Sequence, residues 1–452
     1  MLKLYNTLSR QVENFTPLNK EEIGLYTCGP TVYNFVHIGN LRTYIFEDIL
    51  RRVMQYDGYH VKHVMNITDV GHLTDDADSG EDKMEKGARR EGKSAWDVAA
   101  FYTEAFFQDI KALNILEAHI ICKATDHIPE QIAQVQALTD KGLTYETSDG
   151  IYFDTTKLSD YGKLALLSKQ ELQAGVRVDM GEKKNPHDFA LWKFTPAEEK
   201  RQMEWEAFGR MGFPGWHIEC SAMSMKYLGD QFDIHCGGID HIPVHHTNEI
   251  AQAEGITGKI PWVKYWLHGE FLQISGEKMA KSGDNFLTLK TVADQDISPL
   301  AYRYFLLQAH YRKQLQFSWE ALTAAESGLN NLKKEIQKLD KIGPDDTKAE
   351  AEFKAAINED LNMPATLALV WTYVKERSIG QELISKFDEV LGLDLLVSNN
   401  APVDITPQAQ ALLEARANAR NNKNWTESDR LRDELGKLGY TVKDSTTGQT
   451  LE

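Results

Sequence analysis

Two separated groups of residues in the sequence have the chemistry of a phosphate-binding site. The first is His37-Ile38-Gly39-Asn40, which follows a loop containing glycine and proline. A histidine at a helix start lies beside unpaired N–H groups and the positive end of the helix dipole, and Gly39 lets a ligand approach the backbone. The second is Lys278-Met279-Ala280-Lys281-Ser282, where two flexible lysines suit a loop that closes on a triphosphate. Each group on its own also fits a helix cap or a solvated charged loop.

Four further residues have the side chains of a metal site. His245 and Glu249 are four residues apart in a predicted helix, so both project from one face. Cys220 precedes them, and Cys28 lies far upstream. Two thiolates, an imidazole and a carboxylate form a plausible zinc site. The spacing alone leaves a second interpretation open, in which the cysteines are small core residues and the histidine is a core or capping residue.

These residues must be positioned by a fold that joins distant segments. Ile23–Thr27 is expected to form a buried strand, and Tyr44, Ile45 and Ile49 recur at helical spacing after the loop. This strand–loop–helix unit is typical of the first βα unit of a doubly wound parallel sheet, which binds nucleotides at the carboxyl ends of its strands. A second strand is predicted to end near Asn66. The predicted fold is therefore an α/β Rossmann-type catalytic domain.

The rest of the chain is expected to add an insertion, a helical bundle and a small α+β domain. Linkers rich in Gly, Pro and Asn separate the later segments. The predicted domains are the first half of the sheet at residues 1–125, a connective insertion at 126–214, the second half of the sheet with the lysine loop at 215–318, a helical bundle at 319–398, and a tail domain at 403–452.

Composition limits the class of protein. The 452 residues are 42% hydrophobic, and no apolar run approaches the ~20 residues that span a bilayer. The N-terminus lacks a signal-peptide core, so we expect a cytoplasmic protein without a membrane partner. Four cysteines in such a long chain do not form a disulfide framework. The acidic stretch Gly71–Asp82 matches no calcium loop and is expected to be a solvated loop.

The net charge of −17 argues against RNA binding over the whole surface. A local basic face could still bind RNA, and the acidic remainder would then orient it. Arg416, Arg420 and Lys423 recur at helical spacing in the tail and form a candidate basic stripe. A solvated helix face explains the same pattern.

The two phosphate-binding groups, in this order, resemble the two signatures of class I aminoacyl-tRNA synthetases. Tyr26–Gly29, Gly215–Met223 and Phe232–His235 are similar to stretches of cysteinyl-tRNA synthetases, and the likeness extends from Leu2 to about Gly448. The resemblance implies a ligase that activates L-cysteine with ATP and transfers it to the 3′ end of tRNA(Cys). It also implies Mg²⁺ with the ATP, and we expect a monomer.

The resemblance assigns roles to individual residues. Cys28, Cys220, His245 and Glu249 match the family's zinc ligands, which implies one zinc per chain that selects the cysteine thiolate. His37, Lys278 and Lys281 would be catalytic. The implied ATP-binding residues are His37, Gly39, Asn40, Asp240, Lys278 and Lys281. The implied substrate-binding residues are Cys28, Gly29, Thr31, Asn66, Thr68, Trp216, His217, His235 and Asp240. Arg416, Arg420 and Lys423 would contact tRNA.

The sequence departs from the family pattern at two positions, and two alternative functions stay open. Asn40 stands where the family usually has histidine, and Ala280 where it usually has serine. The cysteine ligase of mycothiol synthesis resembles the same catalytic half but would not need an anticodon-binding tail. A non-catalytic RNA-binding relative is the other alternative, and the presence of His37, Lys278, Lys281 and the metal ligands counts against it.

Overall fold

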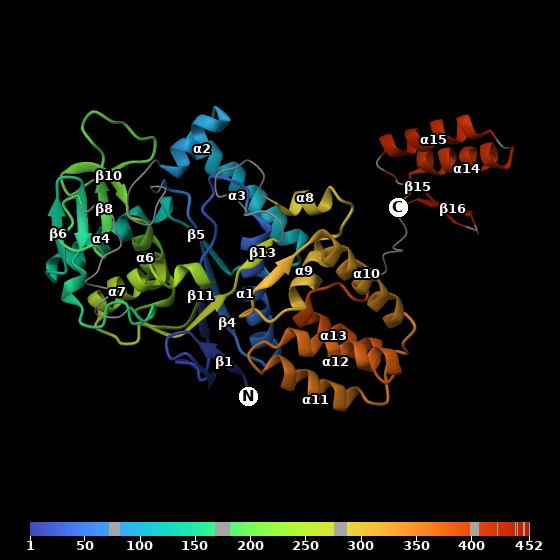
Figure 1. Ribbon diagram of the computed structural model, residues 1–452, viewed down its shortest axis with the longest axis horizontal. Helices are drawn as coiled ribbons and strands as arrows, with labels where there is room; N and C mark the ends of the chain where they lie inside the picture. Colours follow the sequence, from blue (N-terminus) through green and yellow to red (C-terminus); the bar gives the residue numbers. More distant parts are fainter. Residues whose placement is uncertain are drawn as a thin grey trace. The chain divides into compact units, whose positions relative to one another are not determined.

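The computed structural model of the chain describes residues 1–71, 82–167, 181–274, 287–397, 406–422, 424–438, 440, 442–445 and 448–451. The chain divides into two compact units, Met1–Asp394 and Leu395–Glu452, and each is described by itself (Figure 1). Among the helices of these ranges, none is both long and apolar enough to cross a bilayer.

The larger unit is built on a five-stranded parallel sheet. The strand order is β12 (Val263–Gly269), β11 (Phe232–Gly238), β3 (Ile23–Thr27), β4 (Val61–Ile67) and β5 (Ile120–Lys123). From β3 the chain moves outward to β4 and β5, and it later returns on the other side of β3 as β11 and β12. The order therefore reverses between β3 and β11, which is where such sheets bind ligands. The predicted doubly wound sheet with an insertion is confirmed.

Helix α1 (Ile38–Tyr56) packs against β4, β11 and β12. Its buried residues include Leu41, Ile45 and Ile49, which recur at helical spacing and cover the sheet. After β4, the helices α2 (Lys83–Glu91) and α3 (Ala95–Ala112) begin at the side-chain caps Asp82 and Ser94. Most of the predicted acidic loop, residues 72–81, lies outside the described residues.

An antiparallel sheet forms most of the insertion. In the chain, η1 (Thr125–His127) and α4 (Ile128–Asp140) precede this sheet, and η2 (Thr155–Lys157) follows its second strand. Its strand order is β6 (Thr144–Thr147), β7 (Gly150–Phe153), β8 (Phe189–Phe194), β10 (Arg210–Pro214) and β9 (Trp205–Ala207). Strand β10 leads through Gly215 into α6 (Trp216–Leu228). A Cβ at Gly215 would lie 2.0 Å from the Ala190 carbonyl oxygen, so only glycine permits this close approach.

The second half of the sheet is followed by helices. After β11 come η3 (Ile239–His241) and α7 (His245–Thr257); after β12 come β13 (Leu272–Ile274), α8 (Leu289–Ala293), α9 (Pro299–Leu307) and β14 (Leu315–Phe317). Strands β13 and β14 pair in parallel. The helical region contains α10 (Trp319–Ile336), α11 (Asp346–Ile357), α12 (Met363–Glu376) and α13 (Gln381–Leu391). At the N-terminus, β1 (Lys3–Asn6) and β2 (Gln11–Asn14) form a hairpin against β12.

A buried ion-pair network fixes the helical region to the sheet. Asp48 of α1 accepts hydrogen bonds from Arg303 at 2.6 Å and from Arg52 at 2.8 Å, and all three side chains are buried. Arg303 also donates to the carbonyl oxygen of Leu391 at the end of α13. Because these charges are paired and hydrogen-bonded, their burial is tolerated, and they tie α1 to α9 and α13.

The smaller unit combines two helices with a hairpin. These are α14 (Pro407–Asn421), α15 (Trp425–Lys437), β15 (Val442–Ser445) and β16 (Gly448–Leu451). Ala409, Leu435 and Val442 form its buried core. The α+β tail is thus present, whereas the exact domain boundaries given above stay a prediction.

Candidate active site and metal cluster

The structure brings the four predicted metal ligands together. Cys28 directly follows β3, Cys220 lies in the second turn of α6, and His245 and Glu249 occupy the first two turns of α7. Their ligand atoms all lie within 4.8 Å of one another, and all four residues are buried. Strand β3 pairs with β11, and the Cys28 N–H donates to the Cys236 carbonyl oxygen at 3.3 Å. This pairing places Cys28 beside the segment that leads into α7.

The four side chains of the cluster shift one another's pKa values. A hydrogen bond with the Cys28 thiol, together with His245, lowers the pKa of Cys220 to about 7. Burial by itself would raise the pKa of Glu249, but His235 and His245 lower it to about 2. Burial likewise opposes the protonated form of His245, yet Glu249 and Cys220 raise its pKa to about 10. The His245 proton therefore balances part of the charge on Cys220 and Glu249, while burial raises the pKa of the Cys28 thiol well above its usual value. A divalent ion bound here would have to displace these protons, so binding would be coupled to proton release.

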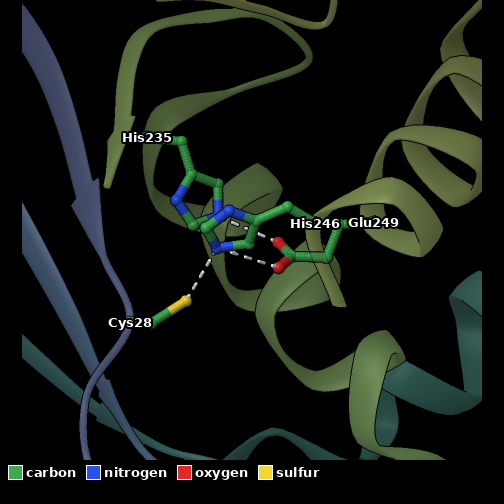
Figure 2. Close-up of side chains that lie close together, drawn as sticks. All are labelled: Cys28, His235, His246 and Glu249. Carbon is green, nitrogen blue, oxygen red and sulfur yellow. Dashed lines mark hydrogen bonds and ion pairs between the residues drawn. The ribbon is translucent and has the colours of Figure 1, made fainter. Parts of the chain in front are cut away.

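A second possible ligand set overlaps the first. It consists of Cys28, His235, His246 and Glu249, and its ligand atoms also lie within 4.8 Å of one another (Figure 2). The Cys28 sulfur is 3.3 Å from His246 Nε2, and His235 Nε2 is 3.0 Å from Glu249 Oε2. His235 was predicted to line the substrate pocket, whereas His246 was not predicted as a site residue. The only sequence signal for His246 was its place next to His245.

Aromatic and imidazole rings surround the cluster. The Trp216 ring, at the first position of α6, lies 4.5 Å from the His245 ring. His217 Nδ1 is 3.0 Å from His245 Nδ1. His246 Nδ1 is 2.8 Å from His268 Nε2, which places a further buried histidine behind the ligands. The predicted pocket residues Trp216, His217 and His235 are thus all beside the cluster.

A hydrogen-bond chain connects the ends of β3 and β4. The Gly29 N–H donates to Asn66 Oδ1 at 2.9 Å, and Asn66 Nδ2 donates to Thr68 Oγ1 at 3.0 Å. Thr68 Oγ1 in turn donates to Glu219 Oε2 at 3.3 Å, and Thr31 forms a parallel bridge with Thr68. A Cβ at Gly29 would lie 1.6 Å from the Asn66 carbonyl oxygen. The predicted pocket residues Gly29, Thr31, Asn66 and Thr68 therefore lie together where β3 and β4 end.

Glu219 was missed as a site residue. It precedes Cys220, is fully buried, and burial raises its pKa well above the usual value. Burial therefore favours the neutral form of this carboxyl group, which lies next to the candidate ligand cluster. Its place within the Gly215–Met223 motif was the available signal.

The start of α1 forms a compact cap. Asn40 N–H donates to His37 Nδ1 at 3.1 Å, and His37 N–H donates to Asn40 Oδ1 at 3.3 Å. A Cβ at Gly39 would lie 2.9 Å from the His37 ring. Burial lowers the pKa of His37, and the Asp240 carboxylate opposes this shift. Asn40 thus has a structural partner, and Asp240 lies close enough to act on His37.

Of the remaining predicted residues, three lysines are not described by the structure and two arginines are. Lys278, Lys281 and Lys423 lie outside the described residues. The prediction that Arg416 lies on an exposed basic stripe is wrong, because Arg416 is only 1% exposed and donates to Gln449 Oε1. Helix α14 directs this side chain toward β16, so its guanidinium bonds within the tail unit. Arg420 is partly exposed, and its guanidinium lies 5.7 Å from the ring of Trp425.

Comparisons with known proteins agree with this geometry. Residues 14–327 match the catalytic domain of class I (C) tRNA synthetases, and residues 403–451 match the anticodon-binding domain of cysteinyl-tRNA ligase. The chain is 53% identical to cysteine–tRNA ligase 1 of Burkholderia lata, over 100% of this chain and 96% of the relative. It is 44% identical to cysteine–tRNA ligase of Treponema denticola, over 98% of each.

A solved structure shares the fold. Methionyl-tRNA synthetase of Mycobacterium tuberculosis, in complex with methionyl-adenylate, aligns with a TM-score of 0.58 at 16% identity, over 82% of this chain and 88% of that one. This likeness shows the fold alone. The assignment to a family rests on the full-length identity to the relatives and on the two family matches. The chain therefore belongs to the cysteine–tRNA ligase family of class I aminoacyl-tRNA synthetases.

Proposed function

We propose that the chain joins L-cysteine to the 3′ end of tRNA(Cys) through a cysteinyl adenylate, and that zinc in the buried cluster selects cysteine. The observation that carries this proposal is the set of two thiols, an imidazole and a carboxylate within 4.8 Å of one another, in a chain whose relatives are cysteine–tRNA ligases. Cysteine and serine differ only by sulfur and oxygen, a difference that shape alone discriminates poorly.

The donor set fits zinc. Two sulfur donors, one nitrogen and one oxygen match the tetrahedral sites that zinc prefers, and hard cations such as Mg²⁺ would favour oxygen ligands. Cys28, Cys220, His245 and Glu249 would hold the ion. When bound, zinc would supply affinity for the thiolate of the substrate, because it lowers thiol pKa values and prefers sulfur.

The walls of the pocket would hold the amino acid. Trp216 and His217 lie on the α6 side of the cluster, and Thr31 and Thr68 lie on the sheet side. The glycine at position 29 supports close packing there, because a side chain would collide with the backbone at Asn66. Asp240 would bind the cysteine amine or the ribose hydroxyls. This arrangement would orient the cysteine carboxylate toward the start of α1.

ATP would bind at the start of α1. His37 lies at the helix N-terminus, where the positive end of the dipole favours phosphate, and Gly39 has no side chain to cover the backbone. The lowered pKa of His37 favours the neutral ring. Because Nδ1 accepts from the Asn40 N–H, the Nε2–H of this ring would be the group that donates to a phosphate oxygen. Lys278 and Lys281 would stabilise the departing pyrophosphate, with Mg²⁺ bound to the ATP.

The tail would bind the anticodon side of tRNA(Cys). This part of the chain matches an anticodon-binding domain, which favours tRNA over an amino sugar as the acceptor. Trp425 is 57% exposed and Arg420 lies over its ring, a pair suited to stacking on a base. Removing the residues after Val397 should leave adenylate formation intact and strongly reduce tRNA charging. We further propose that the protein acts as a monomer in the cytoplasm.

One pair of assays tests the proposal. Purified protein should catalyse cysteine-dependent exchange of pyrophosphate into ATP, and it should then attach labelled cysteine to total tRNA. Serine should support neither reaction. Exchange without charging would leave cysteine activation but refute transfer to tRNA, and the absence of exchange would refute the proposed activity.

A further inference from the structure

A buried carboxylate at the connection between α11 and α12 joins three parts of the larger unit. Asp360 is 4% exposed, and its Oδ1 accepts from the Tyr5 N–H at 2.8 Å and from the Tyr311 hydroxyl at 2.7 Å. Its Oδ2 accepts from Arg312, through Nε at 2.7 Å and through Nη2. Tyr311 and Arg312 belong to the α9–β14 segment, residues 308–314. Asp360 thus connects β1 and this segment to the helical region.

The backbone at Asp360 adopts an unfavourable conformation. Asp360 and Leu361 both have a φ of 55°, in the left-handed region that residues with a Cβ rarely adopt. The Asp360 N–H donates to the Lys3 carbonyl oxygen at 3.1 Å, which holds this turn against β1. Such conformations persist only where the surrounding structure imposes them. The turn therefore directs the Asp360 carboxylate at the α9–β14 segment despite the strain in its own backbone.

The other side of the α9–β14 segment is bound to α1 by Arg42. Arg42 is 4% exposed, and its guanidinium donates to the carbonyl oxygens of Lys313 and His310, the latter at 3.4 Å. It lies in the second turn of α1, two residues after Asn40. Asn40 and His37 cap one another at the helix start. Arg42 thus links the position of the segment to the residues expected to bind ATP.

Packing alone does not fix the α9–β14 segment, because a cavity lies between it and α1. The lining of this cavity includes Phe46 of α1, Tyr311 of the segment and Leu361 beside Asp360. The rings of Phe46 and Tyr311 stack with their centres 4.4 Å apart. Side chains that face a void lose van der Waals contacts on that side. The hydrogen bonds of Asp360 and Arg42 therefore supply much of the restraint on the segment.

We infer that Asp360 is a positioning residue for ATP, which acts through the α9–β14 segment and Arg42 on the start of α1. This inference rests on the proposed ATP site at that helix start. Asp360 would act without contacting the nucleotide. A carboxylate that only held the fold together would change the stability of the protein and leave the affinity of the folded form for ATP unchanged.

Asp360→Asn is the first test. Asparagine keeps the shape of the side chain and tolerates a left-handed backbone, but its amide cannot pair with the charge of Arg312. The Kd for ATP, measured by calorimetry on the full chain, should rise at least about fivefold and up to about 100-fold, the scale on which a small displacement of a binding group acts. The affinity for cysteine without ATP should stay as in the wild type. An unchanged Kd for ATP in folded Asp360→Asn would overturn the inference.

Two further variants decide the question even if Asp360→Asn does not fold. Tyr311→Phe removes one hydroxyl from Asp360 and keeps the ring on Phe46, so the Kd for ATP should rise about two- to tenfold, the net effect of one hydrogen bond. Arg42→Lys keeps the charge but not the guanidinium fork, and it should also weaken ATP binding. An unchanged Kd in both variants would overturn the inference. In the double variant, the effects of Asp360→Asn and Arg42→Lys should be less than additive, because both act through the same segment; strict additivity would contradict this.

Asp57→Asn is the matched control. Asp57 caps the opposite end of α1, and its carboxylate accepts from Lys354 at 3.1 Å and from Asn358 at 3.2 Å, so it also joins α1 to the helical region. This variant should lower the midpoint of thermal unfolding but keep the wild-type Kd for ATP. A rise as large as that in Asp360→Asn would overturn the specific role of Asp360. Wild-type protein that binds ATP without catalysing pyrophosphate exchange would refute the proposed function, whereas the comparison of ATP affinities would still decide this inference.

Discussion

Replacing Cys220 by serine separates metal binding from the rest of the fold. Cys220 is buried in α6, and its pKa of about 7 makes the thiolate available near neutral pH. A serine hydroxyl stays protonated there and is a poor ligand for zinc. The substitution changes one atom, so the packing around α6 should be preserved.

The magnitude follows from the four-residue donor set. Structural zinc sites release roughly 10–16 kcal/mol on binding, so one ligand of four accounts for about 3 kcal/mol. That free energy corresponds to a zinc dissociation constant raised by about two orders of magnitude. Cysteine binding should weaken with zinc loss, while ATP binding at the start of α1 should change little. Selectivity for cysteine over serine should fall for the same reason.

The assay is a zinc titration against a competing chelator, followed by pyrophosphate exchange with cysteine and with serine. Cys122→Ser is the matched control, because Cys122 is equally buried but donates to the Met65 carbonyl oxygen and belongs to neither ligand set. It should keep the wild-type zinc affinity. A Cys220→Ser protein that binds zinc as tightly as the wild type would refute the ligand assignment. Active wild-type protein without zinc would refute the role of the metal.

Three further changes test other parts of the molecule. Lys281→Ala should raise the barrier to adenylate formation by about 2–4 kcal/mol, the effect of one lost transition-state donor, and an unchanged exchange rate would contradict this role. Asn40→His should replace the hydrogen bond to the His37 N–H by a titratable ring, so the rate should change modestly and gain a pH dependence near ~6.5; complete inactivation would show that the amide cap is essential. His63 is buried beside Arg51, and burial followed by that charge lowers its pKa to about 3. The unfolded chain therefore binds the proton first, and stability should fall by about 2 kcal/mol between pH 7 and pH 5 relative to a His63→Gln variant in denaturant unfolding; parallel pH profiles would exclude this contribution.

Several features of the active site could be predicted from local sequence. The strand at Ile23–Thr27 and the helix after His37 follow from apolar spacing and from the break at the glycine and proline between them. His245 and Glu249 share a helix face because they are four residues apart. These features depend on neighbours within a few residues, so a sequence pattern is enough to predict them.

Other features depended on contacts between distant segments. Cys28 meets Cys220 because β3 pairs with β11 and α6 packs beside them, and no spacing rule covers that distance. His246 joins the cluster for the same reason. The resemblance to a family anticipated the ligand set, but not the second set that overlaps it.

Arg416 and a pair of aromatic rings show the same limit of local patterns. Arg416 has the spacing of an exposed basic stripe, yet packing against the tail hairpin buries it. Phe35 and Phe101 form one surface only because α3 folds back beside the loop before α1. The sequence by itself determined the local elements, the family and the residue types available for chemistry. The tertiary structure decided which of those residues are buried, which are exposed and which share a site, because burial and long-range contact are properties of packed elements and not of chain order.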